Sequence, residues 1–151
     1  MNLYGEDWDD ARQDDPPGWK AKWVRVGRRL GAERLGGTVY ELERGNAICP
    51  YHFHFEEEEM LIVLRGEATL RTPEGERRLS TGDCVLFKRG PEGAHLVRND
   101  TEQPVRVLML SASSDVEVCV YPDSDKIGAF APDLRFLAPR SAEVDYFEGE
   151  E

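Results

Sequence analysis

Two histidines that flank a single residue, followed by a run of four glutamates, are the side chains of this sequence best suited to chemistry. His52 and His54 lie in the segment Gly45–Gly66, which reads GNAICPYHFHFEEEEMLIVLRG. Side chains of a β-strand alternate between its two faces, so residues two apart point the same way, whereas on an α-helix they would diverge by about 200°. If the two imidazoles act together, they act from a strand.

Glu59, the last residue of the glutamate run, lies five residues after His54. Five is an odd number, so an unbroken strand would place Glu59 on the face opposite to the histidines. A turn within Phe55–Glu58 removes this conflict, and the apolar run Met60–Leu64 then forms the next strand. Two strands joined by a tight acidic turn would bring two imidazoles and a carboxylate onto one face, a set that suits zinc, iron, manganese, nickel or copper. Taken alone, a histidine pair of this kind is more often a surface or packing feature, and a glutamate run is more often a solvated turn.

The third histidine lies in the segment Gly82–Asn99, which reads GDCVLFKRGPEGAHLVRN. Gly82 with Asp83, and then Gly90–Gly93, are turn signals on either side of the apolar strand Cys84–Phe87. His95 therefore opens the strand that follows the second turn.

Together the two segments resemble the two sequence motifs of the cupin superfamily. The spacers after Gly45 and after Gly82 are longer than usual, and a single residue separates Gly93 from His95 where two are usual. These shifts concern the shape of the loops rather than the histidines. The residues that match the first motif are Gly45, His52, His54, Glu59 and Gly66, and those that match the second are Gly82, Pro91, Gly93, His95 and Asn99.

The resemblance implies both a metal site and a fold. Carried over by position, the family's ligands are His52, His54, Glu59 and His95. An octahedral ion bound by three histidines and one glutamate keeps two positions open for water, substrate or dioxygen. The implied cofactor is a divalent transition metal, which is zinc, iron, manganese, nickel or copper, and the ligand set does not choose among them. The implied fold is the double-stranded β-helix, or jelly roll.

Short strand-like segments separated by turns run along the chain, and no segment has a clear helical period. About nine or ten such strands predict an all-β protein, built as an antiparallel sandwich or barrel, which agrees with the implied jelly roll. A length of 151 residues indicates one domain, and the motif pair occurs once. We divide the chain into a polar N-terminal arm (residues 1–22), a cupin β-barrel (residues 23–121) and an extended C-terminal strap (residues 122–151).

The composition argues against several partners and compartments. A net charge of −11 repels nucleic acid and anionic membrane surfaces. No apolar run approaches the roughly 18–20 residues of a membrane span, and the acidic N-terminus lacks the apolar core of a secretory signal, so we expect a cytoplasmic protein. The odd count of three cysteines favours free thiols, and we expect Cys49, Cys84 and Cys119 to be small buried side chains. Cys49 has the parity opposite to His52, so we expect it to point away from the histidines and not to bind metal.

The strand that carries the histidines predicts a pocket on one face and a contact surface on the other. Inward-pointing Ile48, Leu61 and Val63 would give an apolar pocket suited to a small-molecule ligand or substrate. The opposite face would carry three aromatic side chains that need cover from a second sheet layer or from a partner subunit, and we predict a homodimer. These aromatic residues are Tyr51, Phe53 and Phe55.

Three functions remain open on the sequence alone. The resemblance allows an enzyme, either a metal-dependent dioxygenase acting on an enol or diketone, or an isomerase acting on a sugar or keto acid. An isomerase needs a base other than Glu59, and because no histidine is left, the candidates are Tyr40, Tyr51 and Glu57, each of which is more often structural; this favours oxygen chemistry. The alternatives are a non-catalytic module that binds a sugar or carboxylate, and a structural cupin with an adventitious metal.

Overall fold

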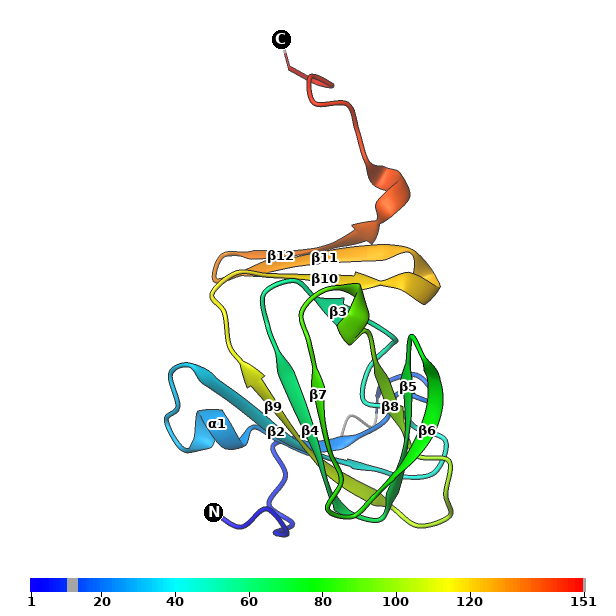
Figure 1. Cartoon of the computed structure of the whole chain (residues 1–151). Coiled ribbons are helices and arrows are strands. Elements are labelled where there is room, and N and C mark those ends of the chain that lie inside the picture. Colours follow the sequence, from blue (N-terminus) through cyan, green and yellow to red (C-terminus); the bar gives the residue numbers. More distant parts are fainter. Residues whose placement is uncertain (11–13, 151) are drawn as a thin grey trace.

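The computed structural model of the chain describes residues 1–10 and 14–150. This part contains twelve strands, one short α-helix and three 3-10 helices (Figure 1). The strands are β1 (Lys22–Val24), β2 (Leu35–Leu42), β3 (Phe53–His54), β4 (Glu59–Arg65), β5 (Glu67–Thr72), β6 (Gly75–Ser80), β7 (Cys84–Phe87), β8 (Leu96–Arg98), β9 (Val105–Ala112), β10 (Glu117–Tyr121), β11 (Lys126–Ala131) and β12 (Leu134–Pro139). The helices are α1 (Val26–Arg29), η1 (Pro91–Gly93), η2 (Pro122–Ser124) and η3 (Arg140–Ala142).

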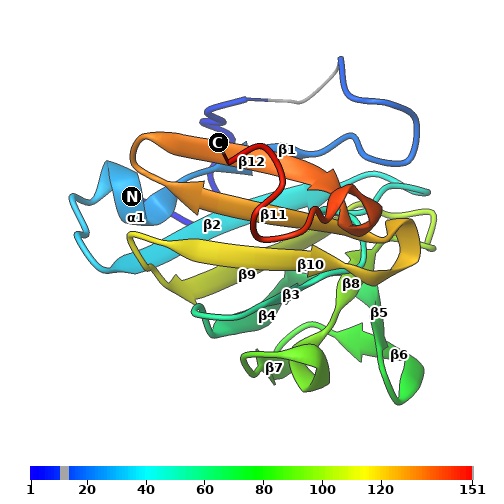
Figure 2. The same cartoon turned by 90° about the horizontal axis from the view of Figure 1, so that it is seen from above.

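The described strands form three antiparallel sheets. Their orders are β1-β2-β9-β4-β7, β6-β5-β8 and β12-β11-β10-β3. Figure 1 shows the four-stranded sheet as a layer across one end of the other strands, and Figure 2 shows β10, β11 and β12 side by side. Strands far apart in sequence lie next to each other, such as β2 with β9 and β3 with β10. The predicted all-β jelly-roll barrel is confirmed.

The main core lies between the five-stranded and the three-stranded sheets. Its buried side chains come from β2, β4, β7 and β9 on one side and from β5, β6 and β8 on the other. On β4 the period of two is clear, because Leu61 and Val63 are buried in this core while Ile62 packs against a separate cluster on the other face of the sheet. Ile48 also lies in the core, so all three residues expected to point inward are buried there.

Two segments differ from the sequence-based expectation. Val26–Arg29 forms a single helical turn, which is too short to leave a period of 3.6 in the sequence. Residues 126–139, expected as part of an extended strap, form the hairpin β11–β12, whose first strand pairs with β10 along its whole length. None of the helices in the described ranges is long and apolar enough to cross a membrane. The division of the chain into arm, barrel and strap stays a prediction.

The aromatic side chains beside the histidines find most of their cover within the chain. Tyr51 and Phe53 are buried in a cluster with Ala94 and Val120, and Ile127 of β11 packs against it. Phe55 is 48% exposed. The hairpin β11–β12 therefore helps to cover these aromatic side chains within the chain. The homodimer stays a prediction, and the need to cover these residues no longer supports it.

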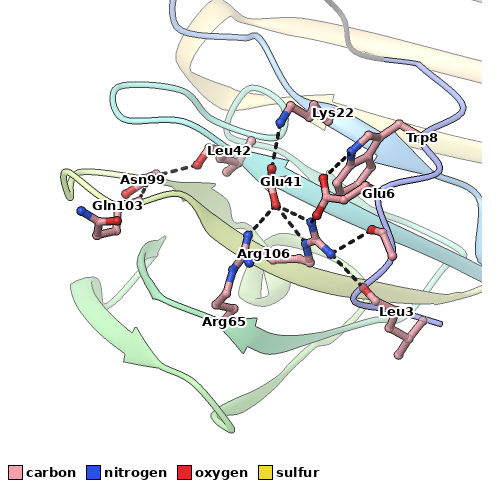
Figure 3. A network of polar contacts seen from close by, with 11 residues as sticks. Leu3, Glu6, Trp8, Lys22, Glu41, Leu42, Arg65, Asn99, Gln103 and Arg106 are labelled. Atoms are coloured by element: carbon pink, nitrogen blue, oxygen red, sulfur yellow. Dashed lines mark hydrogen bonds and ion pairs between the residues drawn. The ribbon is translucent and has the colours of Figure 1, made fainter.

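The N-terminal residues are attached to the outside of the barrel through a buried arginine (Figure 3). Arg106 of β9 is fully buried, and its guanidinium donates hydrogen bonds to Glu41 Oε2 at 2.6 and 3.0 Å. It also donates to Glu6 Oε1 at 2.7 Å and to the carbonyl oxygen of Gly5 at 3.0 Å, and it lies 4.7 Å from the centre of the Trp8 ring. The sequence places Arg106 on the face opposite to the core, and the N-terminal residues are what bury it there.

Candidate metal centre

The two histidine-bearing segments meet at a β-bridge between His52 and His95. The backbone N–H of His95 donates to the carbonyl oxygen of His52 at 2.9 Å, and the reverse bond measures 3.2 Å. His54 is the last residue of β3, and Glu59 is the first residue of β4. The fold thus brings together all four residues that the resemblance indicated.

Donor atoms of His52, His54 and Glu59 lie within 4.8 Å of one another, and His95 contacts this group through Glu59. His52 Nε2 lies 3.0 Å from His54 Nε2, and Glu59 Oε2 lies 3.3 Å from His54 Nε2 and 3.2 Å from His95 Nε2. Adjacent ligands at about 2.1 Å from a single ion are roughly 3.0–3.4 Å apart. Both Glu59 Oε2 and His95 Nε2 are buried, and neither makes a hydrogen bond to any residue that the structure describes. This arrangement of lone pairs fits a common cation.

The outer ring nitrogens of two histidines are fixed by backbone carbonyls. His52 Nδ1 lies 2.9 Å from the carbonyl oxygen of Pro50, and His95 Nδ1 lies 2.9 Å from that of Gly93. A carbonyl oxygen only accepts, so each Nδ1 carries the hydrogen and donates it, which leaves Nε2 as the ring nitrogen that can bind a cation. The sequence did not reveal these partners, because they are backbone atoms placed by the turn geometry.

The third histidine has a different outer partner. His54 Nδ1 lies 3.2 Å from Cys119 Sγ and 3.8 Å from Glu117 Oε1, both on β10. Cys119 is directly opposite His54 in the register of β3 and β10, so the pairing of these strands creates the contact. No spacing in the sequence links the two residues.

The residues of the cluster differ in the direction in which the pKa of each is shifted. Burial, helped by the neighbouring histidines, lowers the pKa of His52 to about 4, so this imidazole is neutral at pH 7. Burial opposes ionisation of Glu59, but the close approach of the His54 and His95 rings to its carboxyl outweighs burial and holds the pKa of the carboxyl well below its usual range. Burial likewise opposes the charge on His54, yet Cys119 and Glu59 together raise its pKa. A carboxylate and a neutral imidazole at neutral pH are the forms that bind metal.

The expected turn within Phe55–Glu58 takes the form of a loop that crosses from one sheet to another. β3 belongs to the four-stranded sheet and β4 to the five-stranded one. The buried carboxylate of Glu117 accepts backbone N–H bonds from Phe55 at 3.0 Å and from Glu57 at 2.8 Å. β10 therefore holds the loop in place. The loop brings Glu59 to the side of the histidines, where an unbroken strand would not place it.

Apolar and aromatic groups surround the donor atoms. The ring of Phe87 stacks on His95 with a centroid distance of 3.7 Å and an angle of 8°. Tyr121 stacks on His52 at 5.9 Å, and burial raises its pKa to about 12, so it is a neutral phenol at pH 7. Of the candidate bases named from the sequence, Tyr51 lies in the apolar cluster, Glu57 accepts the backbone N–H of Ser114 at 3.0 Å, and Tyr40 packs against the core.

The cysteines depart from expectation at two positions. Cys49 Sγ lies 3.5 Å from His52 Nδ1, because bends over residues 48–51 interrupt the strand and remove the parity on which the prediction rested. Cys49 Sγ also lies 3.9 Å from His52 Nε2, so the thiol lies against the imidazole ring and does not point away from it. Cys84 is exposed, so the expectation that it is buried is wrong, whereas Cys119 is buried as expected and Cys49 is half-buried; none of the three forms a disulfide.

The paired motifs, the barrel and the histidine cluster define a class of protein. The family model described as "Cupin domain" matches residues 38–111, a range that contains all four donor residues. The chain therefore contains a cupin domain over these residues.

Solved structures give the same fold. A protein of Silicibacter pomeroyi, described as a sugar phosphate isomerase from a cupin superfamily, is 24% identical with a TM-score of 0.78, covering 82% of this chain and 78% of that one. A protein of Acidithiobacillus ferrooxidans with the provisional name of sugar phosphate isomerase is 26% identical with a TM-score of 0.79, covering 85% and 81%. A polyketide cyclase of Streptomyces resistomycificus is 23% identical with a TM-score of 0.58, covering 70% and 73%. Comparison with curated proteins found no match.

Proposed function

We propose that the chain binds a divalent transition metal through His52, His54, Glu59 and His95 and uses it to act on an oxygenated small molecule. The observation that carries the proposal is that donor atoms of His52, His54 and Glu59 lie within 4.8 Å of one another, with His95 Nε2 3.2 Å from Glu59 Oε2. Two of these atoms lack a hydrogen bond within the described residues, which is costly unless a further group, such as a cation, satisfies them.

A bound divalent ion would polarise an oxygen of the substrate. The chain's own residues set the conditions for that chemistry. Phe87 covers one face of His95 and, with the apolar core beneath, limits access of water to the donor atoms. Tyr121, a neutral phenol stacked on His52, is placed to donate a hydrogen bond at the edge of the site.

The reaction that we propose first is isomerisation of a hydroxy-carbonyl compound such as a sugar phosphate. The similarity to the Acidithiobacillus ferrooxidans protein supports it, because that similarity covers 85% of this chain at 26% identity. An isomerase of this kind needs a base that moves a proton between adjacent carbons, and a bound ion would polarise the carbonyl group.

A dioxygenase acting on an enol or diketone is the second candidate. Glu57 and Glu117, which lie in or beside the loop that ends at Glu59, already accept backbone N–H bonds. Their carboxylates therefore have structural roles and are not available as a base. Oxygen chemistry does not require a separate carboxylate base, so this observation favours the dioxygenase. A binding module without turnover would use the same ion to hold its ligand.

Elemental analysis of protein purified without added metal tests the proposal first. We expect about one equivalent of a divalent metal, and a His52→Ala variant is expected to lose it. The metal-loaded protein is then incubated with aldose and ketose phosphates in deuterated water and followed by NMR, and with diketones in an oxygen electrode. Deuterium incorporation with sugar interconversion supports the isomerase, oxygen uptake supports the dioxygenase, and a thermal shift without turnover supports the binding module. Metal-free wild-type protein that takes up no metal contradicts all three.

A further inference from the structure

The face of the four-stranded sheet that bears His54 on β3 continues across β10 and β11 to β12. Along one row of paired residues, His54 lies opposite Cys119, Cys119 opposite Gly128, and Gly128 opposite Leu137. Directly paired residues of antiparallel strands, and residues two apart along a strand, share one face. The same face therefore includes two further rows, one of Tyr121, Lys126 and Pro139 and one of Glu117, Phe130 and Arg135.

Side-chain contacts agree with this register. Tyr121 stacks on His52 at 5.9 Å, and Lys126 Nζ lies 5.6 Å from the centre of the Tyr121 ring. Farther out, the guanidinium of Arg135 lies 5.9 Å from the centre of the Phe130 ring. A continuous series of contacts thus leads from the histidine cluster to a lysine on β11, and a second cation follows on β12.

The floor between the two cations is apolar. A Cβ atom placed on Gly128 would lie 2.8 Å from the Phe130 ring and 3.2 Å from Leu137 Cδ1, so these two side chains lie over the glycine. Lys126 and Arg135 flank this floor from the rows on either side of Gly128. Backbone spacing puts the two rows about 13 Å apart, a span that a small molecule and two long side chains can bridge.

Neither cation forms an ion pair with a carboxylate in the described part of the chain. This contrasts with Arg29, Arg71 and Arg98, each of which pairs with at least one carboxylate. In a chain with 30 acidic and 19 basic residues, two cations left without a carboxylate on the face of the metal site are available for an anion from outside. The other face of this sheet carries apolar residues, Phe53, Val120, Ile127 and Phe136 among them, so the cations are confined to the face of the histidines.

We propose that Lys126 and Arg135, with the phenol of Tyr121, bind an anionic group of the substrate, a phosphate monoester or a carboxylate, while its hydroxyl or carbonyl oxygens reach the metal. The inference rests on the proposed function and narrows its substrates to anionic molecules. Charge-assisted hydrogen bonds from ammonium and guanidinium groups are the interactions suited to such an anion.

Titration calorimetry on metal-loaded protein tests the assignment with three probes, D-ribose 5-phosphate, D-gluconate and uncharged D-ribose. We expect the wild-type protein to bind at least one anionic probe more tightly than D-ribose. Each of Lys126→Ala and Arg135→Ala is expected to weaken that binding at least about tenfold, since each removes a charge-assisted hydrogen bond to the anion. Lys126→Arg and Arg135→Lys keep the charge and are expected to recover most of the affinity. The preferred probe tells a phosphate site from a carboxylate site.

The control variant is Arg77→Ala, which removes an exposed cation of β6 in a different sheet and is expected to leave every affinity unchanged. Equal binding of the anionic probes by wild-type protein and by the Lys126→Ala/Arg135→Ala double variant overturns the inference, as does absence of binding by both anionic probes. Metal content separates the two proposals. A double variant with full metal content but weak anion binding supports both the metal site and the anion site. A wild-type protein without metal that still binds the anion through Lys126 and Arg135 contradicts only the metal proposal.

Discussion

Cys119 Sγ lies 3.2 Å from His54 Nδ1, the ring nitrogen on the side away from the other three donor atoms. The thiol is buried, and its strand partner in the register is His54 itself. Such outer partners orient a ligating imidazole and tune its basicity. A residue that the sequence suggested only as a small buried side chain therefore touches the candidate metal centre.

Replacing Cys119 by alanine is expected to lower metal affinity about 10- to 100-fold without unfolding the protein, since it removes an outer partner of a ligand rather than the ligand. Competition with a chromogenic chelator measures the change. The matched control is Cys84→Ala, which removes an exposed thiol on β7. An equal loss in both variants would show that thiol removal acts through something other than His54.

The glutamate run offers a test within adjacent residues. Glu59→Gln removes a proposed ligand and is expected to lower metal affinity by more than about 100-fold, a larger effect than that of an outer partner. Glu58→Gln changes the preceding, exposed side chain and is expected to leave metal content intact. Elemental analysis of both variants after identical purification decides, and equal metal content in the two contradicts the ligand role of Glu59.

Glu117 is expected to position the loop that leads to Glu59. Glu117→Gln leaves a single acceptor oxygen for backbone N–H groups that now use two carboxylate oxygens, so we expect a loss of about 1–3 kcal/mol in the free energy of unfolding. Metal affinity should fall as well, because the loop is freed. Glu56→Gln, on an exposed side chain of the same loop, serves as the control in urea unfolding and metal titration. If Glu117→Gln lowers stability but leaves metal affinity unchanged, the position of the loop does not determine metal binding.

The buried ion pair of Arg106 with Glu41 gives a prediction on stability. Arg106→Met leaves the carboxylate of Glu41 buried with fewer partners and is expected to destabilise the protein by about 3–5 kcal/mol. Arg65 also donates to Glu41, at 2.8 Å, but it is 52% exposed, so Arg65→Met is expected to change stability by less than about 1 kcal/mol. Arg106→Met should also make residues 1–10 more sensitive to limited proteolysis, since Gly5 and Glu6 lose their partner.

Acid stability should depend on the same carboxyl group. Burial raises the pKa of Glu41, but hydrogen bonds from Arg106 and Lys22 outweigh burial, so its pKa in the folded protein is below the ordinary value of 4.5. A depressed pKa gives stability that is present above the unfolded value and is lost as the pH falls through the folded value. We expect the free energy of unfolding of the wild type to decrease as the pH is lowered below 4.5, and that of Glu41→Gln to decrease less. Urea unfolding at several pH values measures both. Identical pH profiles would contradict this.

Part of the candidate site could be predicted from local sequence rules. The spacing of His52 and His54 places them on one face, and the apolar run after Glu59 is typical of a core strand; both features appear in the structure. His95 required the family resemblance, because no local rule indicates that Gly93–His95 lies beside residues more than forty positions earlier. Long-range pairing is decided by the whole fold and leaves little trace in either segment.

The features that escaped prediction depend on tertiary contacts. Cys49 faces His52 because bends replace the strand on which its parity was counted. Arg106 occupies a position that alternation assigns to the solvent side, and only the folded N-terminal residues bury it. The hairpin β11–β12 lies in a Pro- and Asp-rich stretch whose apolar residues are too scattered to predict strands, and its register is set by β10.

The donor residues belong to three separate sheets. His54 comes from the four-stranded sheet, Glu59 from the five-stranded one, and His95 immediately precedes β8 of the three-stranded one. A cation held by all four residues would cross-link these layers, which are otherwise joined by side-chain packing and by backbone hydrogen bonds such as those between His52 and His95. Unfolding of any one layer would then require release of the ion, so saturation with metal would make the three layers melt as a single unit and delay that melting in proportion to the logarithm of free metal concentration.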